Sequence, residues 1–197
     1  MEQHYTKEDW KQAYTQNIHR PGADRLLAWL ESTDFFTAPA STRFHGAFEG
    51  GLCHHSVNVW HRLLQLRQRM NEVPGMPRFS EETAAVCGLL HDVCKANFYG
   101  VEMRNRKNEQ GQWEKYPFYV VNEAFAYGHG EKSVFLIERV MRLTTEEAVA
   151  IRFHMGAFDD STRNAYGNAV EQVPLAFWLH TADMMASHFD EAGDGRK

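Results

Sequence analysis

The sequence is poor in cysteine, in long apolar runs and in surplus positive charge. It has three cysteines, Cys53, Cys87 and Cys94, and this odd number fits neither a disulfide framework nor the paired spacing of a zinc site. No apolar stretch approaches the roughly 18 residues of a membrane span, and the polar start MEQHYTKEDWKQ does not resemble a signal peptide. These absences predict a cytoplasmic protein with free, buried thiols and no membrane association.

The charge balance argues against a protein that binds long nucleic acids. The chain carries 21 basic and 26 acidic residues, a net charge of −5, whereas proteins of long nucleic acids usually show a basic excess. Its 43% hydrophobic content over 197 residues is ample for one core, so we predict a single domain over residues 1–197. Eleven histidines are many for such a chain, and histidine is the commonest metal ligand and a proton carrier near pH 7.

Hydrophobic periodicity and turn residues predict a mainly α-helical fold, a bundle of about seven helices with one β-hairpin over residues 101–121. Ser80 is a predicted N-cap, and Thr144 with Glu147 forms a capping-box pattern. We expect irregular structure over residues 33–50 and 155–173 and a frayed tail over 191–197. The helices are predicted over residues 7–17, 22–31, 52–71, from 80 through 92, from 131, over 144–154 and over 174–189.

The main candidate functional motif is the stretch Gly88-Leu89-Leu90-His91-Asp92-Val93-Cys94-Lys95. If a helix continues through it, His91, Asp92 and Lys95 fall within an arc of about 100°, and the leucines lie on the other side, toward a core. An imidazole beside a carboxylate on one helix face can hold a divalent metal from two adjacent residues. From these eight residues alone, a chance His–Asp pair on a solvated helix face explains the pattern as well as a metal site does.

Other candidates lie at helix ends or on apolar helix faces. Asp183 shares its predicted face with alanine and leucine, where a lone carboxylate costs several kcal/mol unless it is paired or metal-bound. The alternative is a buried aspartate satisfied by an arginine or a helix N-terminus. His55 follows a Gly-Gly approach one turn inside a helix, His129 precedes a helix, and His154 ends one. Taken singly, each histidine is more often structural than a ligand.

In chain order, these residues resemble a known family. The order His55, His91-Asp92, Asp183 resembles the HD superfamily of metal-dependent phosphohydrolases, and His91-Asp92-Val93-Cys94-Lys95 has its His-Asp-x-x-Lys form. Two further histidines between the pair and the last aspartate are similar to its dinuclear members. The segment TAPASTRFHGAFEGGLCHHSVNV looks like the corresponding part of YhaM-type 3′–5′ exoribonucleases. The resemblance covers about residues 37–190, on which helices 7–31 are expected to pack, and it includes no separate OB domain.

The resemblance implies a ligand set. His55, His91, Asp92 and Asp183 would hold one ion, and Asp92 would bridge to a second ion held by His129 and His154. Imidazoles and carboxylates suit Mn, Fe, Co, Ni or Zn better than Mg. Such ions acidify a bound water and, as a pair about 4 Å apart, can clamp a phosphoryl group.

Several cations and one further histidine are weaker candidates. Lys95 would neutralise phosphate charge or orient the attacking water, and its alternative is a surface lysine. His45 is favoured as a phosphate contact or general acid, whereas Arg43 is as well explained by a salt bridge as by phosphate. On the hairpin, basic and aromatic side chains together can follow a single strand, although a solvated hairpin explains them as well. Its substrate-binding candidates are Arg104, Arg106 and Lys107.

We therefore predict a metal-dependent phosphohydrolase or phosphodiesterase that acts on a nucleotide or short oligonucleotide. A 3′–5′ exonuclease acting on single-stranded RNA or DNA is an alternative within this class. A non-catalytic module that binds metal or nucleotide and regulates a partner is the alternative outside it. The sequence leaves the oligomeric state open.

Overall fold

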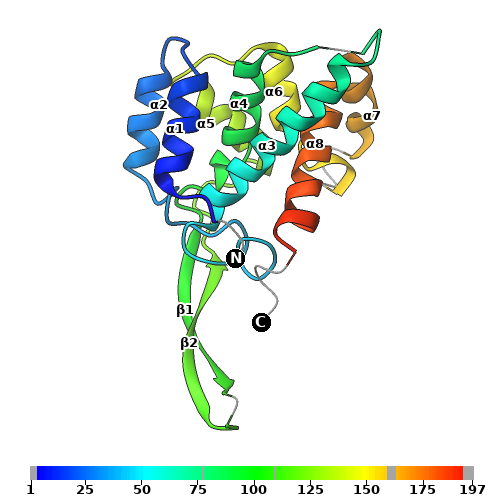
Figure 1. The fold of residues 1–197 in the computed structure, drawn as a ribbon. Helices are drawn as coiled ribbons and strands as arrows, with labels where there is room; N and C mark the ends of the chain where they lie inside the picture. The colour runs from blue at the N-terminus through cyan, green and yellow to red at the C-terminus, as the bar shows by residue number, and fades with distance from the viewer. Residues whose placement is uncertain (1–3, 77, 109, 159–162, 193–197) are drawn as a thin grey trace.

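The computed structural model describes residues 4–76, 78–108, 110–158 and 163–192. Within these residues it is a bundle of eight α-helices with one antiparallel two-stranded hairpin, as the periodicity predicts (Figure 1). The helices are α1 Lys7–Asn17, α2 Ala23–Glu31, α3 Gly51–Asn71, α4 Glu81–Leu90, α5 His129–Glu138, α6 Thr145–Arg152, α7 Arg163–Gln172 and α8 Leu175–Met185. The strands are β1 Tyr99–Lys107 and β2 Trp113–Val121. Short 3₁₀ turns cover Val93–Lys95 and Gly156–Phe158, and the π-helix Ala186–Asp190 follows α8.

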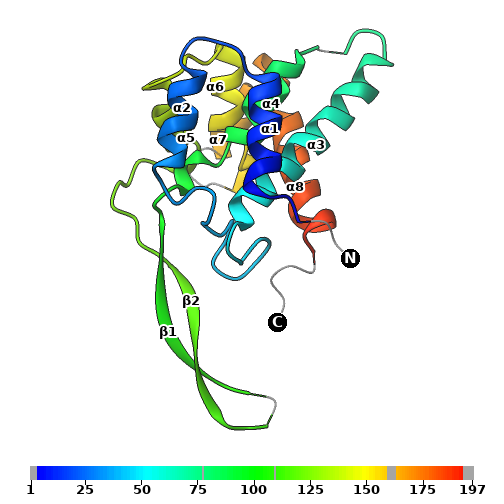
Figure 2. The ribbon, with the colours of Figure 1, turned by 60° about the vertical axis from the view of Figure 1, so that its left-hand side comes forward.

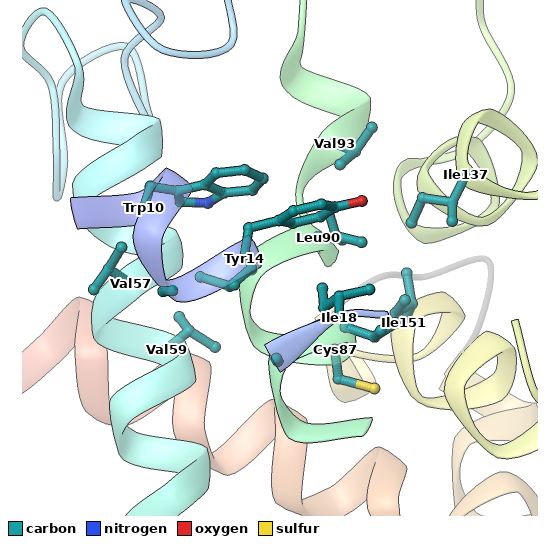
Figure 3. Packing of buried hydrophobic residues seen from close by; sticks show 14 of the residues in the cluster. Trp10, Tyr14, Ile18, Val57, Val59, Cys87, Leu90, Val93, Ile137 and Ile151 are labelled. Carbon is teal, nitrogen blue, oxygen red and sulfur yellow. The ribbon is translucent and has the colours of Figure 1, made fainter. Parts of the chain in front are cut away.

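One large hydrophobic core joins the N-terminal helices to the rest of the bundle. Trp10 and Tyr14 of α1 are buried and stack on each other, with ring centroids 5.0 Å apart. They pack with Val57 of α3 and Leu90 of α4 in the same cluster, and Ile151 of α6 belongs to it as well (Figure 3). Both N-terminal helices contribute fully buried side chains to this core, and α1 packs directly on α3, which carries His55, and on α4, which leads to His91.

Helices α3 and α4 approach each other closely at a glycine. A Cβ atom placed on Gly88 would lie 2.5 Å from the Cα atom of Trp60, so a larger residue would push the two helices apart. This contact lies three residues before His91, and His55 stands on α3 between Gly50 and Trp60. The close packing therefore brings the two histidine-bearing segments side by side.

The hairpin projects away from the helices (Figures 1 and 2). Its register pairs Tyr99 with Val121 at the base and Lys107 with Trp113 near the tip, over nine residue pairs. Gly111 turns the chain with a φ of 79°, a conformation that favours glycine. The base is anchored where the Tyr99 hydroxyl donates a hydrogen bond of 3.0 Å to the carbonyl of Ala40. The predicted hairpin is confirmed, and its first strand begins two residues earlier than expected.

The predicted caps are also present. Thr144 and Glu147 form the reciprocal capping box of α6, and the Ser80 hydroxyl accepts the hydrogen bond from the Thr83 amide that begins α4. The three cysteines are free and buried, which confirms the prediction for the thiols. No helix in the described part of the chain is long and apolar enough to cross a membrane.

Two expectations were wrong, and a third was wrong at its first residue. The helix from Ser80 does not continue through Asp92: α4 ends at Leu90, and Asp92 leaves helical geometry with φ −105° and ψ 21°. The physical reason is tertiary, because the Cys94 amide donates its hydrogen bond to the Ser133 hydroxyl of α5. The expected loop over 155–173 contains α7, whose Ala169 packs on Phe153 and Ala176. The tail expected to fray begins with Glu191, which is only 1% exposed; residues 193–197 lie outside the described part.

Candidate metal centre

His55 stands at the start of α3, directly after the turn that Gly50 makes with a φ of 81°. Its Nδ1–H donates to Glu191, whose two carboxylate oxygens both lie 3.1 Å away. Its Nε2 lies 3.2 Å from Oδ1 of Asp183, which projects from α8. The ring is 1% exposed, so every polar neighbour of His55 belongs to the protein interior or to the cavity described below.

The break after α4 places His91 and Asp92 at the centre of the site. His91 Nδ1–H donates to the Gly88 carbonyl at 2.9 Å, and its Nε2 lies 3.3 Å from His55 Nε2. The Asp92 carboxylate has a separate neighbour on each oxygen. Oδ2 lies 3.5 Å from His91 Nε2, whereas Oδ1 faces His129 Nε2 at 2.8 Å. Departure from the helix thus lets one carboxylate reach two groups of histidines.

His129 and His154 complete the second group. His129 is the first residue of α5, and its Nδ1 also lies 3.4 Å from the Cys94 thiol. His154 follows the end of α6, its Nδ1–H donates to the Ile151 carbonyl at 2.6 Å, and its Nε2 lies 3.5 Å from Asp92 Oδ1. Among the described residues, that buried Nε2 has no hydrogen-bond partner, which is costly for a polar atom in a protein interior.

The charges of this cluster are strongly coupled. Burial raises the pKa of Asp92, but the charge of Lys95 and the surrounding histidines outweigh it and hold the pKa well below its usual range. Lys95 Nζ lies 2.6 Å from Asp92 Oδ2, and despite burial this partner raises the pKa of the lysine. Burial lowers the pKa of His55, but Glu191 and Asp183 reverse this and raise it to about 10. Metal-free His55 therefore carries a positive charge near neutral pH.

A cavity of about 420 Å³ opens onto the cluster. His45 lines it with its ring centroid 4.8 Å from that of His55. Burial and the charges of His55 and Lys95 lower the pKa of His45 to about 4, so the ring is neutral near pH 7 and suits hydrogen bonding better than proton storage. The lining residues are Ala40, Ser41, Thr42, His45, His55, Asp92, Lys95, Tyr99, Val121, His129, Met155, Phe158, Asp183, Met184, Ser187 and His188. Arg43 is not among them; it is exposed and stacks on Phe44.

The hairpin has two faces, because directly paired residues point to the same side. The pocket face includes Tyr99 and Val121, which line the cavity, and continues through Val101, Met103, Asn105, Lys107, Trp113, Lys115, Pro117 and Tyr119. The outer face carries Glu102, Arg104, Arg106, Glu114, Tyr116 and Phe118. Arg104 lies 3.7 Å from the Phe118 ring centroid, and Arg106 pairs with Glu114 at 2.6 Å. Of the three hairpin cations predicted to bind substrate, only Lys107 lies on the pocket face.

Sequence reasoning missed Glu191 and Asn58. Asn58 donates a hydrogen bond of 2.8 Å to Glu191, which in turn accepts from His55. The signal for Asn58 was its place one turn after His54 and His55 on a buried helix face. Glu191 gave no comparable signal, because it lies in a polar, glycine-containing tail.

The donor set fits a divalent transition metal. His55, His91 and His154 each donate from Nδ1 to a protein oxygen, so in the neutral ring the lone pair is on Nε2. These Nε2 atoms converge on the carboxylates of Asp92 and Asp183. The sets His55, His91, Asp92 and Asp92, His129, His154 each bring three ligand atoms within 4.8 Å of one another. The unpartnered Nε2 of His154 gains a partner when an ion is bound.

The comparisons with known proteins agree with this geometry. The HD-domain family model matches residues 52–185, and the chain belongs to this family of metal-dependent phosphohydrolases. Neither the curated proteins nor the solved structures gave a match. The match spans all six candidate ligands, from His55 to Asp183.

Proposed function

We propose that this protein hydrolyses a phosphoester bond in a nucleotide or short oligonucleotide, with two divalent ions at the site. The observation that carries the proposal is the Asp92 carboxylate, which lies between His91 on one side and His129 and His154 on the other. His55, His91 and Asp183 complete the first ion's ligands together with Asp92. When bound, such ions supply an acidified water and positive charge for the phosphoryl group.

The remaining side chains of the cavity suit a phosphorylated small molecule. Lys95 lines the cavity beside Asp92 and is placed to neutralise phosphate charge. The neutral His45 and the hydroxyls of Ser41 and Thr42 can contact phosphate or sugar oxygens. Apolar side chains such as Met155 and Met184 can cover a base. The volume of about 420 Å³ falls within the range of small-molecule sites.

The exonuclease alternative is less well supported than a small substrate. Arg104 and Arg106 lie on the outer face, where Glu102 and Glu114 are their respective carboxylate partners. If the hairpin nevertheless follows a strand, replacing Arg104, Arg106 and Lys107 together by alanine raises KM for oligonucleotides more than for mononucleotides. Equal effects on both substrates, or none, exclude this alternative.

The proposal is tested by anaerobic purification, metal analysis and an assay panel of dNTPs, NMPs, cyclic dinucleotides and short single-stranded RNA and DNA. The result expected is hydrolysis of a small nucleotide by the metal-loaded protein and none by an Asp92→Asn variant. A protein that binds metal and nucleotide but cleaves no substrate, including a generic aryl phosphodiester, is instead a regulatory module.

A further inference from the structure

The pocket face of the hairpin is an exposed apolar surface. Val101, Met103, Trp113 and Val121 are 60%, 61%, 71% and 56% exposed, respectively. The hairpin extends beyond the helices along most of its length (Figures 1 and 2), so the described residues leave this face open. A two-stranded ribbon alone is marginally stable, and a contiguous exposed apolar patch usually marks an interaction site.

The charges of this face disfavour a nucleic-acid strand as its occupant. Between the cavity and the tip, the pairs Val101–Tyr119 and Met103–Pro117 provide no cation. Lys107 and Lys115 are confined to the outer half of the arm. A strand leaving the cavity along this face would therefore set its first phosphates over uncharged side chains.

The charges around this face are complementary to those of a second copy of the same face. Lys107 and Lys115 make the tip end positive, whereas the exposed Glu49 carboxylate acts electrostatically on Tyr119, nearer the cavity. Burial raises the pKa of Tyr119, and the charge of Glu49 raises it further. Lys115 and Tyr119 lie two residues on either side of Pro117, whose pair with Met103 is apolar. A two-fold rotation about this pair reverses the strand direction in the second copy. Lys115 of one copy then faces the end of the hairpin where the charge of Glu49 acts in the other copy.

We propose that two copies of this chain associate through their pocket faces, with the hairpins antiparallel around a two-fold axis at the Met103–Pro117 pair. In this dimer, Lys115 of the partner subunit lies over Tyr119 and beside Glu49. Trp113 of the partner subunit lies over Val121, which lines the cavity. The partner thus covers the apolar face and adds an aromatic side chain to the rim of the site.

Cysteine cross-linking tests the face and the register. Packed sheet faces lie about 10 Å apart, a distance that a short bismaleimide spans. Met103→Cys places a thiol at the proposed axis, and Arg104→Cys places a matched thiol on the outer face one residue away. The expected result is a shift from monomer to dimer mass for Met103→Cys only. The wild-type protein controls for the three native thiols, which are buried.

Sedimentation equilibrium supplies the second test, in the absence of metal and substrate, so it is independent of the proposed activity. One ribbon face is smaller than a standard interface of about 800 Å² per partner, so self-association in the micromolar range is expected. The Met103→Asp variant is expected to be monomeric, whereas Arg104→Asp remains dimeric, both with wild-type helical circular dichroism. A wild-type protein that stays monomeric up to about 0.2 mM overturns the proposal. Equal cross-linking of the two cysteine variants, or weaker binding of a single-stranded oligonucleotide by monomeric Met103→Asp than by monomeric wild type, also overturns it.

Discussion

The Glu191 carboxylate holds the His55 ring in place. It accepts the Nδ1 hydrogen bond at 3.1 Å, is only 1% exposed, and has Asn58 as its other donor at 2.8 Å. This contact fixes the tautomer in which Nε2 faces Asp183, and an anionic acceptor makes an imidazole ligand more basic.

Removing this carboxylate should weaken metal binding. Glu191→Ala is expected to lower the affinity for the first ion by about 10- to 100-fold, because outer partners of ligating histidines contribute effects of this size. Glu191→Gln keeps an oxygen acceptor and should retain most of the affinity. Titration with Mn or Zn followed by calorimetry measures both. Asp190→Asn is the control, because Asp190 pairs with Arg62 on the surface instead. Equal affinity in the alanine variant and wild type contradicts this role.

Asp92 is expected to be essential for hydrolysis. Its oxygens face both histidine groups, so Asp92→Ala should empty or disorder the site and reduce turnover by more than about a thousandfold. Circular dichroism checks that the variant stays folded. A folded variant with nearly normal turnover in the presence of Mn refutes the assignment.

His154 separates a two-ion site from a one-ion site. Within the described part of the chain, its buried Nε2 has Asp92 as its nearest anionic neighbour and lacks a hydrogen bond, so a second ion is its natural partner. His154→Ala should therefore lower bound metal from about two ions to about one per chain, with a large loss of activity. Metal analysis of protein loaded anaerobically with excess Mn or Fe provides the count. If wild type never exceeds one ion, His129 and His154 are better interpreted as phosphate contacts.

Acid should destabilise the metal-free protein partly through Glu191. Burial raises the pKa of this carboxyl, but the charge of His55 and the hydrogen bonds from His55 and Asn58 lower it to about 2, below the usual value of 4.5. A pKa lowered by folding contributes stability that is present above about 4.5 and lost as pH falls toward 2. The shift corresponds to about 3 kcal/mol. In urea unfolding, the stability difference between wild type and Glu191→Gln should shrink between pH 5 and pH 2.5; a constant difference contradicts this.

The sequence predicted the elements whose signals are local. Periodic apolar residues, caps such as Thr144 with Glu147, and the hairpin turn all correspond to observed structure. The candidate ligands were chosen through motif order, and they converge because Gly88 lets α3 and α4 pack closely. What the sequence could not predict depends on tertiary contacts. The end of α4 depends on a hydrogen bond to Ser133, and α7 has only one buried residue, Ala169, to mark its inner face.

The π-helix after Met185 has a consequence for helical phase. In an α-helix, the eight residues from Asp183 to Glu191 advance about 80° beyond two full turns, so the two side chains would point in different directions. The wider π turn, closed by the hydrogen bond from the Glu191 amide to the Ala186 carbonyl at 3.0 Å, rotates less per residue. Both carboxylates therefore reach the same imidazole, one on each ring nitrogen. Deleting one residue between 186 and 190 would place this glutamate seven α-helical residues after Asp183, about 20° short of two full turns, so it would stay on the side of His55 without the π turn.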